Sequence, residues 1–131
     1  MRDNETKFVE RVRPGFAKIL DIRNDEQIVP AWAVDAESNR VLLPGFMNEA
    51  ALIKTIETGL ATFWSRSAGA LWTKGETSGN FLRVRSIVAD CDADSLILLV
   101  EPIGPACHTG EDSCFDETPV IEVIRNGEND E

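Results

Sequence analysis

Short runs of hydrophobic residues, several of them alternating with polar residues, fill the chain between residues 28 and 124. Runs of about four to eight such residues, bounded by glycine, proline and small polar residues, are typical of β-strands. The pattern predicts seven short strands, at residues 28–34, 40–43, 61–65, 70–73, 81–89, 95–100 and 120–124.

Two of these runs predict which side chains face inward. Partial alternation in the fifth run places Leu82, Val84 and Val88 on one face of the strand and two arginines on the other. The run at residues 95–100 is continuously apolar, which is typical of a strand buried on both faces.

Residues 49–58 form the clearest helical segment. Asn48 precedes it as an N-cap, because its side chain can accept a free backbone N–H, and Gly59 follows it as a terminating glycine. Leu52 and Ile56 then share one face, as expected of a helix packed against a core.

One helix among several short strands predicts a mainly β fold of the α+β class, an antiparallel β pseudo-barrel capped by one α-helix. The 131 residues are short enough to form a single domain spanning 1–131. Both ends are polar and charged, so we expect about residues 1–7 and 125–131 to be frayed.

Charge and composition exclude several classes of protein. The net charge of −10 argues against a nucleic-acid partner, which would need basic patches. No apolar run approaches the roughly 20 residues needed to cross a membrane. The first twelve residues are charged throughout and lack the apolar stretch of a signal peptide, so we expect a cytoplasmic protein.

The interpretation of the three cysteines depends on that compartment. Disulfides are rare in a reducing cytosol, and three is an odd number, so metal binding or catalysis becomes the better hypothesis for Cys91, Cys107 and Cys114. For any one of them alone, a small buried side chain is an equally good interpretation.

The segment Asp90-Cys91-Asp92-Ala93-Asp94 carries three carboxylates at alternate positions. In an extended chain the carboxylates would share one side and the thiol would face the other. Oxygen ligands suit Mg²⁺, whereas a thiolate suits Zn²⁺. The alternative is an acidic loop exposed to solvent, and the spacing alone does not exclude it.

A second cluster follows the sixth strand, where a loop rich in glycine and proline carries Cys107, His108 and Cys114. With Cys91 the loop cysteines make three thiolates, which would leave the fourth zinc position open for a water, as a catalytic zinc requires. His108 is the only histidine in the chain. It is a fourth ligand, a general base, or a residue with a packing role only.

A third group of polar residues lies between residues 65 and 80. Two glycines bracket hydroxyl side chains there, and two cations lie nearby, which favours a loop that binds phosphate, although the spacing is not that of a P-loop. Trp72 is interpreted either as a residue that packs on a nucleobase or as a half-buried core residue. The candidate substrate-binding residues are Arg66, Trp72, Lys74, Gly75, Glu76, Ser78 and Gly79.

Taken together, five segments resemble the phosphoribosyl-AMP cyclohydrolase family: VLLPGFMNEAAL, ATFWSRS, LWTKGETSGN, DCDADSLILLVE and GPACHTGEDSCF. They span roughly residues 41–115 in the order of the family. The resemblance implies a β-rich pseudo-barrel capped by a helix, and a zinc- and magnesium-dependent hydrolase of histidine biosynthesis. The implied reaction opens the adenine ring of phosphoribosyl-AMP to give the formimino aminoimidazole carboxamide ribotide. Because the chain ends soon after the last predicted strand, we expect no fused pyrophosphohydrolase domain.

The resemblance also assigns roles to individual residues. It implies a homodimer in which zinc is held between subunits, by Cys91 of one chain and two cysteines of the other. It implies attack of zinc-bound hydroxide on the ring, with His108 moving the proton. The implied magnesium ligands are Asp90, Asp92 and Asp94, and the implied zinc ligands are Cys91, Cys107 and Cys114.

Two other functions compete with this one. A zinc-dependent nucleobase deaminase is disfavoured, because the chain has neither the CxxC nor the HxE motif of those enzymes. A non-catalytic zinc-binding interaction module remains open, and a test of turnover separates it from the hydrolase.

Overall fold

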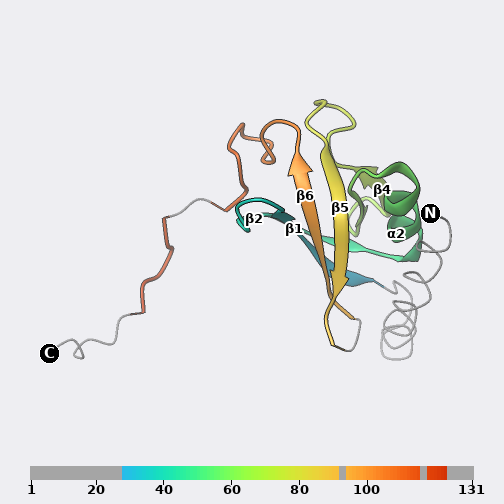
Figure 1. Cartoon of the computed structure of the whole chain (residues 1–131), viewed down its shortest axis with the longest axis horizontal. Helices are drawn as coiled ribbons and strands as arrows, with labels where there is room; N and C mark the ends of the chain where they lie inside the picture. Colours follow the sequence, from blue (N-terminus) through green and yellow to red (C-terminus); the bar gives the residue numbers. More distant parts are fainter. Residues whose placement is uncertain (1–27, 92–93, 116–117, 124–131) are drawn as a thin grey trace, which may run out of the picture.

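The computed structural model describes residues 28–91, 94–115 and 118–123, and its strands and helix follow one another as in Figure 1. All seven elements come from short segments with the patterns described above. In chain order they are β1 (Val29–Asp35), β2 (Val41–Met47), α2 (Glu49–Thr58), β3 (Thr62–Ser65), β4 (Ala70–Thr73), β5 (Leu82–Ala89) and β6 (Leu96–Pro102).

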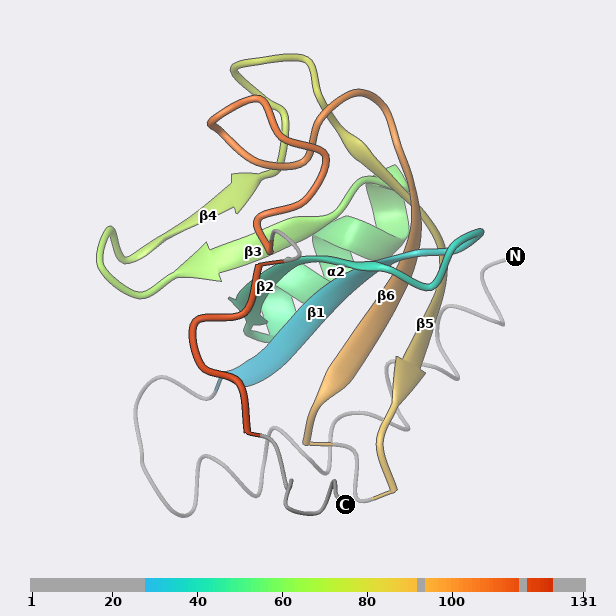
Figure 2. The same ribbon diagram turned by 90° about the vertical axis from the view of Figure 1, so that its left-hand side faces the viewer.

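The strands form two sheets. Four of them make one sheet in the order β2-β1-β6-β5, while β3 and β4 pair separately in a two-stranded sheet. The mainly β class with one helix is therefore confirmed for the described residues, but the larger sheet does not close into a barrel. Helix α2 lies beside the two-stranded sheet and covers one side of the larger one (Figure 2).

One strand pair differs from the expected antiparallel arrangement. Strands β1 and β6 run parallel, with Ala31 opposite Leu96 and Asp35 opposite Val100. The β5–β6 hairpin fixes the direction of β6, and β2 already occupies the other edge of β1. Strand β6 therefore pairs along the free edge of β1, and the pairing there is parallel.

The helix begins and ends where the sequence predicts. The side chain of Asn48 accepts a hydrogen bond from the backbone N–H of Ala51 (2.8 Å), and Gly59 adopts φ 78° and donates to the carbonyl of Thr55. A positive φ is readily available to glycine and costly for other residues. Leu52 is fully buried, and Ile56 packs against the same core.

The core lies on only one face of β6, so the prediction of burial on both faces is wrong. Leu98 is fully buried, whereas its neighbour Ile97 is 41% exposed. In β5 the register shifts between Val84 and Ser86, and this bulge reverses the alternation that follows it. Val88 consequently points outward and is 46% exposed, contrary to the sequence prediction.

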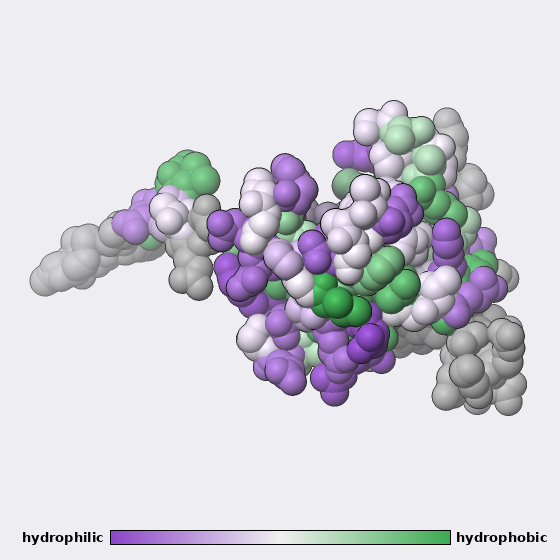
Figure 3. Space-filling view, turned by 90° about the horizontal axis from the view of Figure 1, so that it is seen from above, coloured by the Kyte–Doolittle hydropathy of each residue, from purple (hydrophilic) through white to green (hydrophobic). Residues whose placement is uncertain are grey.

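The predicted last strand is not found in the part of residues 120–124 that the structure describes. Residues 120–123 pair with no strand, and Val120 is 97% exposed. Their hydrophobic side chains lie apart from the main body in Figure 3. An isolated apolar run cannot form a stable strand without a partner edge. The predicted frayed ends, 1–7 and 125–131, lie outside the described residues. Among the described residues, no helix is long and apolar enough to span a membrane.

Gly45 brings β2 close to β3. A Cβ atom at this position would lie 2.5 Å from Cδ1 of the fully buried Phe63, so only glycine allows the ring to pack on the β2 backbone. This approach joins the two sheets and sets the position of β3 and β4 relative to the core.

Replacing Gly45 with alanine is expected to lower the free energy of unfolding by about 1–3 kcal/mol, because the added methyl group overpacks the contact. Urea denaturation would measure the change. In a Phe63→Leu background the same replacement should cost much less, since the ring atoms are gone. Equal costs in both backgrounds would show that the ring is not what excludes a side chain at this position.

Candidate metal centre and substrate cavity

Two loops meet at one end of the larger sheet. They are the connection between β4 and β5, and the segment that follows β6; both lie at the top of Figures 1 and 2. A cavity of about 460 Å³, here named the cysteine cavity, lies between them. It is lined by Leu43, Pro44, Trp72, Thr73, Lys74, Gly75, Glu76, Thr77, Ser78, Asn80, Ala106, Cys107, His108, Gly110 and Cys114.

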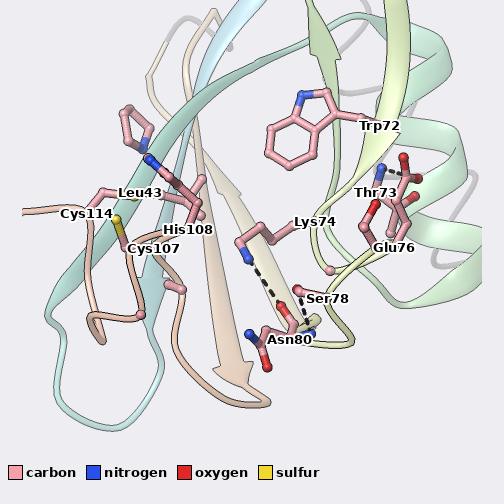
Figure 4. A pocket seen from close by; sticks show the side chains of 15 residues that line it. Leu43, Trp72, Thr73, Lys74, Glu76, Ser78, Asn80, Cys107, His108 and Cys114 are labelled. Atoms are coloured by element: carbon pink, nitrogen blue, oxygen red, sulfur yellow. Dashed lines mark hydrogen bonds between the residues drawn. The ribbon is translucent and has the colours of Figure 1, made fainter.

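The connection between β4 and β5 is a tight loop held by its own hydrogen bonds. The Glu76 carboxylate accepts the backbone N–H of Thr73 (3.0 Å), and the Lys74 ammonium donates to the carbonyl of Asn80 (3.3 Å). The N–H of Gly79 donates to the carbonyl of Gly75 (2.7 Å), so it is already engaged within the loop. The Lys74 ammonium group faces the cavity beside Trp72 (Figure 4).

The segment after β6 folds back on itself and then onto β2. The N–H of Cys107 donates to the carbonyl of Glu111 (3.0 Å), which closes the loop. The N–H of Cys114 donates to the carbonyl of Leu42 (2.7 Å), and the Ser113 hydroxyl donates to the carbonyl of Val41 (2.7 Å). Both loop cysteines are thereby placed at the same cavity, despite the six residues between them.

The pKa values of the two cysteine thiols are shifted in opposite directions. The Thr109 hydroxyl donates to the Cys107 sulfur (3.1 Å), and this hydrogen bond is the main reason that the pKa of Cys107 is lowered. Partial burial of its thiol is the main reason that the pKa of Cys114 is raised, although the residue as a whole is exposed. The Cys114 side chain also helps to lower the pKa of Cys107.

Cys91 lies at the other end of the sheet. It follows β5, whereas Cys107 follows β6, and β6 runs back along β5. The seven residues of β6 span six steps of about 3.3 Å, which separates these ends by roughly 20 Å. Among the described residues, no three His, Cys, Asp or Glu side chains are close enough to hold one metal ion.

Cys91 lies in a turn, and the described acidic residues on either side of it, Asp90 and Asp94, are hydrogen-bonded to each other and not separated as in the extended chain from which opposite faces were argued. The N–H of Asp94 donates to the Asp90 carboxylate (3.0 Å), and the N–H of Asp90 donates to the carbonyl of Ser95 (3.1 Å). Asp92 lies outside the described residues. The described residues of this connection therefore do not show the alternation between two faces that an extended strand would give.

The structure gathers part of the predicted site and leaves the rest elsewhere. Eight candidates line the cysteine cavity: Trp72, Lys74, Gly75, Glu76, Ser78, Cys107, His108 and Cys114. Arg66 lines a different cavity, and neither Gly79 nor the Asp90 turn lines the cysteine cavity. The sequence interpretation missed Leu43 and Pro44, which carry no signal of their own because their place at the cavity comes from sheet pairing. It also missed Asn80, which ends the glycine-rich loop.

Comparison with known proteins identifies the kind of enzyme to which this chain is related. A family model described as phosphoribosyl-AMP cyclohydrolase matches residues 43–116. A phosphoribosyl-AMP cyclohydrolase of Micrococcus luteus is 53% identical over 92 residues, which cover 70% of this chain and 73% of the relative.

Two longer relatives are both named histidine biosynthesis bifunctional protein HisIE. That of Bacteroides thetaiotaomicron is 54% identical over 98 residues, covering 75% of this chain and 48% of the relative. That of Escherichia coli K12 is 52% identical over 99 residues, covering 76% and 49%. The chain thus spans about half the length of these bifunctional relatives.

The matches place the chain among hydrolase-related proteins of histidine biosynthesis. More narrowly, it belongs to the phosphoribosyl-AMP cyclohydrolase family.

The acidities of the two loop thiols predict different reactivity in the metal-free chain. Because the pKa of Cys107 is lowered and that of Cys114 is raised, iodoacetamide should modify Cys107 first and at lower pH. Peptide mass spectrometry across a pH series measures both rates. A Thr109→Val variant should move the Cys107 profile to higher pH and leave Cys91 unchanged. An unchanged profile would contradict the assigned hydrogen bond.

Proposed function

We propose that this chain hydrolyses the adenine ring of phosphoribosyl-AMP to the formimino aminoimidazole carboxamide ribotide in histidine biosynthesis. Membership of the family supports this activity. The observation that carries it is the grouping of Cys107, Cys114 and His108 on one side of a cavity whose other side bears Lys74 and Trp72 (Figure 4).

The two loop cysteines are suitable ligands for zinc. Thiolates are preferred zinc ligands, and the lowered pKa of Cys107 favours its thiolate form. A zinc ion held there would lower the pKa of a bound water to about 7 and so supply the nucleophile.

A third thiol must come from a second chain. Zinc–sulfur bonds are about 2.3 Å long, so the sulfurs on one ion lie within a few ångströms of one another. Cys91 of the same chain is roughly 20 Å away along β6 and cannot join Cys107. Cys91 is exposed at its turn and accessible to another subunit, which supports a homodimer with zinc shared between chains.

The same turn would supply the magnesium ligands. Asp90 and Asp94 are joined through a hydrogen bond, which holds the two residues on either side of Cys91. Carboxylates suit Mg²⁺, because this ion binds one or two of them and keeps water and substrate phosphate in the other positions of its coordination shell. A dimer that places Cys91 at the partner's cavity also carries this turn to that cavity, with Asp92 as the third expected ligand.

The outer face of the larger sheet offers a surface for such a dimer. Trp32, Ile97 and Val88 occupy adjacent strands in one cross-strand row, and all three are exposed. A contiguous exposed apolar row is typical of an interaction surface. It lies near the end of the sheet that bears Cys91, since Val88 is the next-to-last residue of β5 and Ile97 the second residue of β6, so a two-fold contact over it would bring the Cys91 turn to the subunit interface.

His108 is the residue proposed to move the proton. It lines the cysteine cavity next to Cys107 and is exposed to solvent, so it can exchange protons with a nucleophilic water and with bulk solvent. Histidine is the side chain most often used for general acid–base catalysis, which suits this role.

Shared sites can be tested by mixing two inactive variants. Cys91→Ser and Cys107→Ser homodimers should each be inactive, because each lacks one ligand in both sites. After chain exchange, about half of the dimers are mixed, and each mixed dimer regains one complete site. The mixture should therefore show about a quarter of wild-type turnover of phosphoribosyl-AMP.

A mixture of Cys107→Ser and Cys114→Ser is the matched control, since both ligands come from the same chain. It should regain nothing. Activity in the control, or none in the first mixture, would contradict sharing across chains. A wild-type chain that binds zinc but turns over no substrate would instead favour the non-catalytic zinc-binding module.

His108→Ala is expected to lower kcat by about 10²–10⁴-fold with a much smaller change in KM, because a lost proton transfer affects the transition state. His108→Gln provides a control for size. Unchanged kcat in both variants would reduce His108 to a packing role.

A further inference from the structure

A second cavity adjoins the cysteine cavity. We name it the arginine cavity; its volume is about 620 Å³, and it opens beside the two-stranded sheet. Its lining includes Phe46, Trp64, Arg66 and Ser67, none of which lines the cysteine cavity. It therefore holds residues that the proposed reaction at the cysteines leaves without a function.

Arg66 is held in this cavity in a defined position. Its guanidinium carbon lies 4.2 Å from the centroid of the Phe46 ring, so the planar group stacks on the aromatic face. The Ser65 hydroxyl accepts the N–H of Ala68 (3.1 Å), which fixes the turn that follows. An arginine fixed in this way presents N–H donors suited to paired hydrogen bonds with a phosphate.

Trp72 and Pro44 form the wall common to both cavities. Trp72 packs against the buried Phe63, with ring centroids 5.4 Å apart and planes tilted by 34°. The indole is thereby fixed between the two spaces (Figure 4 shows its cysteine-cavity side). A fixed indole beside an open cavity is a suitable stacking surface for a purine.

Each of the two cavities is lined by one cationic side chain. Lys74 is the only lysine or arginine among the residues that line the cysteine cavity, and Arg66 is the only one in the arginine cavity. In a chain with a net charge of −10, these two local cations mark separate positions for anions.

We propose that the arginine cavity binds one phosphoribosyl arm of the substrate while the cysteine cavity binds the other, with the purine crossing at Trp72. This inference rests on the proposed function. The substrate has the matching shape, because its single purine bears phosphoribosyl groups on two sides. Arg66 is then a specificity residue: it distinguishes the two-armed substrate from AMP, which has one arm.

Three arginine or lysine variants of the metal-loaded full chain test the two-cavity arrangement. They are Arg66→Met, Lys74→Met and, as a surface control, Arg83→Met, whose side chain is 60% exposed and lines neither cavity. Turnover of phosphoribosyl-AMP is measured for each variant, and the affinity for AMP is measured by calorimetry.

Both cavity variants should lower kcat/KM for phosphoribosyl-AMP by about ten- to a hundred-fold, the usual effect of losing a charged hydrogen-bond donor. The double variant should show the product of the two effects, because the phosphates are separate. AMP has a single phosphate, so only one of the two variants should weaken its binding. Arg83→Met should change neither quantity.

Equal loss of AMP affinity in both cavity variants would indicate one shared phosphate position and overturn the proposal. An unchanged kcat/KM in Arg66→Met would also overturn it. If Arg66→Met fails to fold, Arg66→Lys keeps the charge, loses the paired donors and should show a smaller loss in the same direction.

Failure of the proposed function is a separate outcome. A wild-type chain that turns over no phosphoribosyl-AMP overturns that function. The unreacted compound can then be compared with AMP by calorimetry, so the two-cavity arrangement is still tested.

Discussion

Strand β6 is hydrogen-bonded along both of its edges, and the position of the site depends on this double pairing. It pairs with β1 on one side and β5 on the other, while Leu98 and Val100 anchor it in the core. A strand held in this way cannot bend enough to bring its ends together. Cys91 and Cys107, which lie beyond opposite ends, are therefore kept apart within one chain, and a site that uses both requires a second chain.

The parts of the fold that local chemistry determines were predictable from the sequence. The helix limits follow from a side-chain cap and a glycine with positive φ, and both are confirmed. The grouping of Cys107 with Cys114 was also predictable from the sequence, because glycine and proline allow this loop to close. In each case, neighbouring residues supply the decisive interactions.

Other features depend on pairing between distant segments, and the sequence pattern did not predict them. The bulge in β5 reverses the faces after Val84, so Val88 lies outside although simple alternation places it inside. The parallel β1–β6 pair joins strands that are far apart in the sequence, and the pattern of each strand alone does not reveal it. Arg66 joins Phe46 in a separate cavity because Gly45 lets β2 approach β3, a contact that leaves no periodic signal.

Native mass spectrometry of the zinc-loaded full chain tests the central claim of a site completed by two chains. The account predicts a dimer with about one zinc per chain, and loss of the zinc from a Cys91→Ser variant that still folds. A monomer that retains one zinc per chain, with or without Cys91, would contradict it.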